Sequence, residues 1–336
     1  MKKGIFALMI IGACWGAPLQ ATDWNNAPLT DVQNAAKQGN AEAQFILGLK
    51  YNNGEGVPKD DKKAAAWYLK AAEQGNADAQ YYLAFLYNVG WGVDEDDKQA
   101  VAWYLKAAEQ GYVDAQYQVG LIYDFGILGT KQDSKQAEAW YLKAAEQGNV
   151  DAQSNLGMLY KTGWGVGIGS GGIRNDEKAV FWLSKAAEQG DVDAQSNLAD
   201  MYINGQGVTK DYKKAEAWYL KAAEQGNVDA QAALGVMYAK GHGVVQNFKQ
   251  ATTWLHKAAE QGLDVAQSNL GVMYANGQGV AQDDKLAYVW CSVAAANGNE
   301  AAAKNRDELA ESLTPSELAK AQALASQYFK QYQPKS

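Results

Sequence analysis

Apolar and small residues recur at helical spacing along nearly the whole chain. Between residues 191 and 226, Ala194, Leu198 and Tyr202 follow one another at intervals of four, which places them on one face of a predicted helix. A second predicted helix has its buried face at Ala215, Trp218, Ala222 and Ala223. The alternation of apolar and polar residues that is typical of strands is absent from the sequence. The pattern therefore predicts an all-α protein.

Glycine and aspartate mark the ends of these two helices. We expect Gly205 to end the first helix in the left-handed conformation and Gly207 to continue the turn. Asp211 is placed to cap the N-terminus of the second helix, and Gly226 ends that helix. The segment is therefore predicted to be a pair of helices joined by a short turn.

The same helix pair is repeated seven times. The segment Lys-Ala-Ala-Glu-Gln-Gly closes six of the units, and its terminal glycine recurs every 36 or 37 residues, with one interval of 42. The predicted units span residues 40–75, 76–111, 112–148, 149–190, 191–226, 227–262 and 263–298. Because a single pair cannot bury both of its faces, stacking of neighbouring units must create the core. The chain is therefore predicted to form a right-handed superhelical α/α solenoid.

Each unit also has one position that is always small and one that is always tryptophan. The small residues are Gly48, Ala84, Gly120, Gly157, Ala199, Gly235 and Gly271, and the tryptophans are Trp67, Trp103, Trp140, Trp182, Trp218, Trp254 and Trp290. Small residues let two helices approach closely, and we expect the tryptophan to fill the space between neighbouring units.

Both ends of the array are predicted to carry capping helices. Residues 22–39 form the N-terminal cap, which resembles a second helix without its tryptophan, and residues 299–336 form the C-terminal cap. Thr314 and Glu317 have the spacing of a capping box, with proline at the first helical position between them. This signature predicts a last helix that reaches about Tyr332.

The first 21 residues have the build of a secretory signal peptide. Lys2 and Lys3 precede an apolar run from Gly4 to Gly16, and small residues follow as far as Ala21. The run is too short to span a bilayer, and we expect no other membrane span in the chain. We therefore predict cleavage near Ala21 and export to the periplasm or the medium. In an alternative interpretation Cys14 becomes a lipidated N-terminus, but the apolar run continues past it and favours soluble export.

Charge and cysteine content exclude some classes of function and an internal disulfide. The formal net charge is −8, which argues against a nucleic-acid binder and against adhesion to an anionic membrane. Without the signal peptide, Cys291 is the only cysteine, so an internal disulfide cannot form. We interpret Cys291 as a small buried apolar residue on a helix.

One glycine-rich stretch has a sequence pattern similar to that of a phosphate-binding loop. Gly167, Gly169 and Gly172 have the spacing of a dinucleotide fingerprint. That fingerprint needs a preceding strand, whereas here a helix precedes it, and the Lys-Ser/Thr pair of a P-loop is absent. We interpret residues 167–172 as an insertion in the turn of the fourth unit that forms a surface loop.

Other candidate chemistry has weak support. His242 and His256 have no set of ligands at zinc-binding spacing around them, and Asp94–Asp97 is better explained as the capped start of a helix than as a calcium loop. No nucleophile motif is found. The sequence therefore predicts no catalytic, cofactor-binding or metal-binding residue.

The most informative signal is variation within the repeat. In each first helix, the positions one, two and five residues after a constant glutamine are expected to point away from the core. These positions are aromatic or apolar in the first units and small or polar in later ones. The predicted partner-binding residues, assigned to a concave face, are Phe45, Tyr81, Tyr82, Phe85, Tyr117, Gln118, Leu121, Asn155, Asn197 and Asn269. Aromatic anchors in such a patch would supply most of the affinity, and the asparagines would bond a peptide backbone.

The unit resembles the Sel1-like repeat, a bacterial relative of the tetratricopeptide repeat. The residues that carry the resemblance in the sixth unit are Ala230, Leu234, Gly235, Tyr238, Gly241, Gly243 and Val244. In the fifth unit they are Asp211, Lys214, Ala215, Trp218, Lys221, Ala222, Ala223 and Gly226. The resemblance covers residues 40–298, with a longer turn in the third unit and the glycine insertion in the fourth.

The resemblance implies an adaptor that holds proteins together, and exported bacterial members act at the envelope or on host factors. A cysteine-rich branch is associated with penicillin binding and β-lactamase activity, but it has a disulfide in each repeat, which this chain lacks. We therefore predict a non-enzymatic scaffold that binds a protein or peptide, a host protein included. The alternatives are an enzyme acting on cell-wall material or β-lactams and an envelope factor that binds glycan strands.

Overall fold

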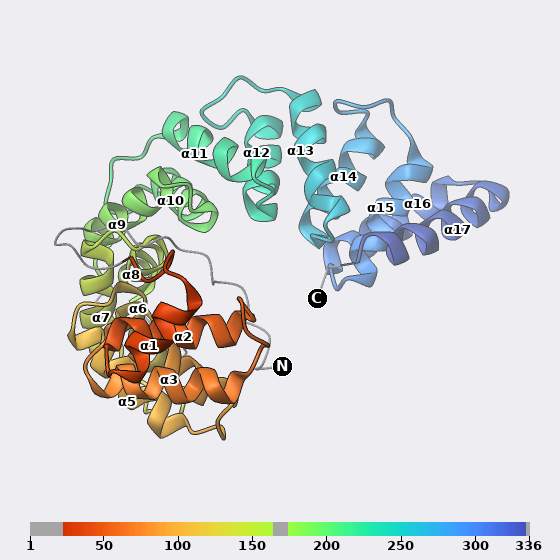
Figure 1. Ribbon diagram of the computed structural model, residues 1–336. Helices are drawn as coiled ribbons and strands as arrows, with labels where there is room; N and C mark the ends of the chain where they lie inside the picture. The colour runs from red at the N-terminus through yellow and green to blue at the C-terminus, as the bar shows by residue number, and fades with distance from the viewer. Residues whose placement is uncertain (1–22, 164–173, 334–336) are drawn as a thin grey trace. The chain divides into compact units, whose positions relative to one another are not determined.

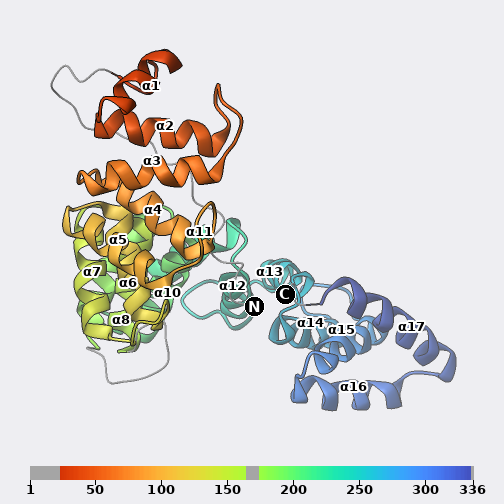
Figure 2. The ribbon, with the colours of Figure 1, turned by 60° about the horizontal axis from the view of Figure 1, so that its bottom comes forward.

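The computed structural model describes residues 23–163 and 174–333 of the chain. Over these ranges the chain forms 17 α-helices and no strand (Figures 1 and 2), which confirms the predicted all-α class. The helices are α1 (Leu29–Lys37), α2 (Ala41–Asn53), α3 (Asp61–Glu73), α4 (Ala77–Val89), α5 (Asp97–Glu109), α6 (Val113–Phe125), α7 (Ser134–Glu146), α8 (Val150–Thr162), α9 (Asp176–Glu188), α10 (Val192–Asn204), α11 (Tyr212–Glu224), α12 (Val228–Lys240), α13 (Phe248–Glu260), α14 (Asp264–Asn276), α15 (Asp284–Ala296), α16 (Glu300–Ser312) and α17 (Pro315–Gln331). The predicted signal peptide, Cys14 and the insertion at Gly167–Gly172 lie outside the described residues. None of the described helices is long and apolar enough to cross a bilayer.

The chain divides into two compact units after Tyr112. Unit 1 contains α1–α5 and unit 2 contains α6–α17. Seven consecutive helix pairs run from α2–α3 to α14–α15, and we call the even-numbered member of each pair the first helix and the odd-numbered member the second helix. Within each unit every second helix packs against the first helix of its own pair.

The ends of the helices are formed as the turn residues predict. Gly205 and Gly207 have positive φ angles of 69° and 65°. The Asp211 carboxylate accepts backbone hydrogen bonds of 3.0 Å from Lys213 and Lys214 at the start of α11. A side chain on Gly207 would also collide with the carbonyl of Asp176, so this turn of the fifth repeat is pressed against the fourth.

The small residue of each first helix lies against its own second helix. A Cβ atom on Gly157 would be only 2.6 Å from Cγ of Leu183, the residue that follows the repeat tryptophan. The small residue therefore leaves room for the side chain that follows the tryptophan. Trp182 and Trp218 belong to the apolar core where the fourth and fifth repeats stack. On the outer side, Lys143 covers the Trp140 ring at 3.6 Å from its centroid, and four further tryptophans are covered in the same way.

A chain of buried glutamines joins neighbouring repeats. Gln195 of α10 donates from Nε2 to the carbonyl of Ala187 in the preceding repeat at 3.1 Å. Its Oε1 accepts from Gln225 at the end of its own second helix at 2.9 Å. The same two bonds recur in unit 1 at Gln80 and in unit 2 at Gln153, Gln231 and Gln267, with Asn297 as the last donor. Both ends of the buried amide are thereby satisfied, and the register of the stack is fixed.

The C-terminal cap has the predicted structure. Thr314 and Glu317 form the capping box, proline follows at the first helical position, and α17 ends at Gln331. The ring of Tyr332 stacks on Trp290 with centroids 5.6 Å apart, and its carbonyl accepts from Gln267 at 3.2 Å. The end of α17 therefore seals the last repeat.

Candidate functional site: the surface of the first helices

The side chains that vary between repeats lie on the first helices, but they are less exposed than expected. Phe45 is only 9% exposed, so the prediction that it points away from the core is wrong. Its ring lies 5.5 Å from that of Tyr82 on the next first helix. The position after the constant glutamine therefore faces the neighbouring first helix, because adjacent first helices pack side by side. The positions two and five after the glutamine are half-buried in most repeats.

In unit 1 this surface consists of packed aromatic rings. Phe45, Tyr68 and Tyr82 form a triangle with centroids 5.5–5.8 Å apart. Tyr81 contacts the rings of Tyr104 and Tyr112. These rings are mutually supported and half-buried or buried, so the aromatic face is rigid rather than a set of free anchors.

The exposed part of the aromatic face is at its edge. Phe85 makes an edge-to-face contact with Trp91, whose side chain is 48% exposed. Trp91 lies in the turn after α4, where the first, fifth, sixth and seventh repeats have glutamate, glutamine or histidine. Helical periodicity does not identify Trp91, although an aromatic residue at this turn position marks it in the sequence.

In unit 2 the same surface begins with one tyrosine and then becomes polar. Tyr117 packs on Tyr141 at 6.0 Å and accepts a hydrogen bond from Asn155 at 3.4 Å, and burial raises the pKa of its phenol. Gln118 and Leu121 are half-buried beside it on α6. Asn155 therefore makes one contact within the protein through its Nδ2 atom, and its role in binding a peptide stays a prediction.

The polar part of the surface is hollowed at the fifth and sixth repeats. A cleft of about 190 Å³ lies between α10, α11 and α12. It is lined by Asp193, Ser196, Asn197, Asp200, Tyr219, Asn227, Asp229 and Ala233. We call this the acidic cleft. It contains one of the predicted site residues, Asn197, whereas Asn269 lies two repeats further on and is half-buried.

Hydrogen bonds hold the walls of the acidic cleft. Tyr219 donates to Asp200, and Lys161 of α8 donates to Asn197 Oδ1 at 2.7 Å. Asn227 donates to Asp193 Oδ1 at 3.3 Å. Burial raises the pKa of the Tyr219 phenol, as does the Asp200 carboxylate that accepts its hydrogen bond, so Tyr219 stays a donor at neutral pH.

Aspartates continue along the N-terminal ends of the preceding first helices. Burial raises the pKa of Asp114 and of Asp151, and the charges of Asp191 and Asp114 raise that of Asp151 further. Asp191 accepts a hydrogen bond of 3.0 Å from Ser154. Negative charge is therefore crowded along this side of unit 2.

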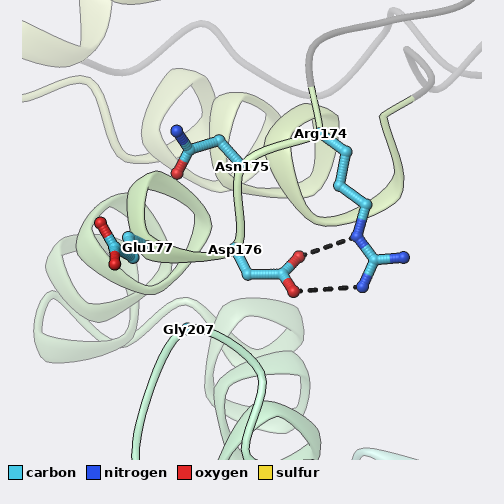
Figure 3. A pocket seen from close by; sticks show the side chains of 5 residues that line it. All are labelled: Arg174, Asn175, Asp176, Glu177 and Gly207. Atoms are coloured by element: carbon cyan, nitrogen blue, oxygen red, sulfur yellow. Dashed lines mark hydrogen bonds and ion pairs between the residues drawn. The ribbon is translucent and has the colours of Figure 1, made fainter.

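A second hollow lies where α9 begins, beside Arg174 (Figure 3). Arg174 is paired with Asp176 through two bonds of 2.9 and 3.1 Å. The Asn175 side chain caps the helix by accepting from the backbone of Lys178. Among the described residues that line this hollow, the only cation, Arg174, is already paired with a carboxylate, which disfavours phosphate binding.

The remaining candidate groups have structural roles. Asp96 caps α5 through the backbone of Lys98 and Gln99, as the sequence indicated. Cys291 is fully buried, and burial raises the pKa of its thiol to about 11. His256 is within 3.1 Å of the Tyr274 hydroxyl. No group of three or more metal-ligating side chains is found in residues 23–163 and 174–333.

Stacked helix pairs with constant packing positions and a variable surface define the class of α-solenoid repeat proteins. The Sel1 repeat model matches residues 41–76, 77–112, 113–149, 150–191, 192–227, 228–263 and 264–299. The chain therefore belongs to the Sel1 repeat family, whose repeats generally mediate protein–protein interaction.

Two solved structures are similar over most of the chain. A Sel1 repeat protein from Oxalobacter formigenes is 36% identical, with 84% of this chain and 79% of that chain covered and a TM-score of 0.65. The protein c5321, a protective antigen present in uropathogenic Escherichia coli strains that displays an SLR fold, is 32% identical, with 90% and 87% covered and a TM-score of 0.52. No curated protein matches the chain.

Proposed function

We propose that the protein is a non-enzymatic scaffold, exported to the bacterial envelope or the medium, that binds a protein or peptide on the surface of its first helices. One observation carries the proposal. The glutamine chain and the glycine turns are repeated in both units, whereas the first-helix surface changes from aromatic rings to a polar cleft. Packing accounts for the repeated residues, and recognition of one particular partner accounts for the surface that changes along the array.

The rigidity of this surface suits recognition. Side chains such as Tyr82 and Tyr219 are already held by their neighbours, so little rotamer entropy is lost when a partner binds. The exposed Trp91, supported by the half-buried Phe85, offers an aromatic anchor in unit 1. The similarity to c5321, a protective antigen, supports the proposed export.

A pull-down with the full-length chain, tagged at its C-terminus, tests the proposal against envelope extract and host proteins. Two variants remove the surface without touching the core: Phe85→Ala/Trp91→Ala in unit 1 and Asn197→Ala/Asp229→Ala in unit 2. A control variant, Ala102→Arg/Ala217→Arg, changes exposed positions of second helices.

We expect one specific protein to be retained by the wild type and the control and lost from at least one surface variant. Loss from the control with retention by both surface variants would place the binding surface on the second helices. Turnover of a β-lactam or of cell-wall fragments by the purified protein would instead support an enzyme.

A further inference from the structure

The acidic cleft is lined by a serine hydroxyl that has no hydrogen-bond partner among the described residues. Ser196 lines the cleft and is only 8% exposed. Among the described residues, no hydrogen bond is formed by its Oγ. In the preceding repeat the equivalent Ser154 donates to Asp191 at 3.0 Å. In the fifth repeat Asn227 stands at the equivalent position of that aspartate, and Ser196 Oγ forms no bond to it. Because this hydroxyl lines the cleft and no protein group bonds to it, it can accept a hydrogen bond from a ligand.

The charge of the cleft is only partly compensated. Asp200 accepts from Tyr219 and forms an ion pair of 3.4 Å with Lys161. Asp193 and Asp229 have no ion-pair partner within the described part of the chain. Two carboxylates in a cleft that also holds a hydroxyl and two amides present several acceptors to a single cationic group.

The protein already holds an ammonium group at the edge of this cleft. Lys161 Nζ lies 2.7 Å from Asn197 Oδ1 and 3.4 Å from Asp200 Oδ2, and its side chain is largely buried. An amide oxygen and a carboxylate on α10 therefore already accept from a lysine that enters from α8. Acceptors without a hydrogen bond in the described part of the chain remain on Asp193 Oδ2, Ser196 and Asp229, because Asp193 Oδ1 accepts from Asn227.

We propose that the acidic cleft binds the ammonium group of a lysine side chain from the partner protein. The inference rests on the proposed function and names the chemistry of one contact on that surface. Asp193 and Asp229 neutralise the incoming charge, and Ser196 Oγ accepts one of its three N–H donors. An anion is excluded by the same carboxylates, and an apolar group would leave the serine unsatisfied.

Peptide binding tests the proposal with the full-length protein. The probe is a fluorescein-labelled glycine–serine peptide that carries lysines, measured by anisotropy at about 0.15 M salt, where contacts between distant exposed charges are screened. The same peptide with acetylated lysines and the same peptide with arginines are the comparison ligands.

Two variants and two matched controls distinguish binding at the acidic cleft from a general effect of the protein's net charge. Asp193→Asn/Asp229→Asn should raise the Kd of the lysine peptide at least about tenfold, because a close charge pair is lost. Ser196→Ala should raise it about threefold, the effect of one hydrogen bond. Glu188→Gln/Glu224→Gln removes the same number of charges from the exposed ends of α9 and α11, and Ser154→Ala removes the partnered serine. Both controls should change the Kd less than about twofold, because exposed distant charges are screened.

Four results would overturn the proposal. They are no binding of the lysine peptide, equal binding of the acetylated peptide, tighter binding of the arginine peptide, or equal weakening by both double variants. The proposed function is judged separately, because a partner that is retained by the wild type and lost from Phe85→Ala/Trp91→Ala supports the scaffold even if the cleft binds no lysine.

Discussion

The two units use the same internal packing but close their first-helix surfaces differently. In unit 1 the position after the constant glutamine holds Phe45, whose ring fills the space toward Tyr82 on the next helix. In unit 2 the same position of the fifth repeat holds Ser196, and a cleft remains beside it. The residue after the constant glutamine thus differs between the closed aromatic surface of unit 1 and the polar surface that contains the cleft. A repeat array can therefore change its binding surface without changing its fold.

The largest expected effect comes from removing the aromatic packing. Phe45→Ala should lower the free energy of unfolding by about 3 kcal/mol, because a buried phenyl ring leaves a cavity between Tyr68 and Tyr82. Urea unfolding followed by circular dichroism measures it. Ser196→Ala at the same repeat position is the control and should change the stability by less than about 0.5 kcal/mol. Equal losses in the two variants would contradict the distinction between closed and open surfaces.

The glutamine chain should behave alike in both units. Gln80→Leu in unit 1 and Gln195→Leu in unit 2 each remove two hydrogen bonds, one to a carbonyl of the preceding repeat and one from the glutamine that ends the second helix. Each should cost about 2 kcal/mol, the net contribution of two hydrogen bonds. Chemical unfolding of the two variants side by side measures this. A large difference between them would show that the units do not share their internal packing.

The two equivalent serines should differ in stability as well as in binding. Ser154→Ala breaks the hydrogen bond to Asp191 and should cost about 1 kcal/mol. Ser196→Ala breaks none and should be neutral. Thermal unfolding of both variants distinguishes them, and a loss at Ser196 as large as that at Ser154 would show that its hydroxyl is already engaged.

The smallest effect is a pH dependence confined to unit 2. Burial lowers the pKa of His256, with the Glu260 charge opposing the shift. A histidine whose pKa is lower in the folded state contributes its full stability above its unfolded pKa of about 6.5 and loses it as the pH falls below that value. The stability advantage of the wild type over His256→Gln should therefore shrink between about pH 7.5 and pH 5.5. If this stability advantage instead grew as the pH fell, folding would raise rather than lower the pKa of His256.

The sequence was sufficient for the repeat, its turns and its caps because each depends on local chemistry. Gly205, Asp211 and the Thr314–Glu317 box specify backbone conformations that short-range rules describe. The all-α solenoid follows from repeating that local unit.

The surface was harder to predict because it depends on how neighbouring repeats meet. Helical periodicity placed Phe45 on the outer face of one helix, but the adjacent first helix covers that direction, so the ring is buried. Periodicity likewise gave no sign that Ser196 and Asp229, on different helices, line one cleft. Trp91 was missed because it lies in a turn, and helical periodicity identifies only residues on helix faces.

Site-specific photo-crosslinking is the most direct test of the claim that the first helices form the binding surface. A benzophenone amino acid is placed at Asn197 on α10 or at the exposed Ala217 on α11, in the full-length protein mixed with envelope extract and host proteins. We predict a crosslink to one specific protein from position 197 and none from position 217. A specific product from position 217 alone would contradict the account and move the interface to the second helices.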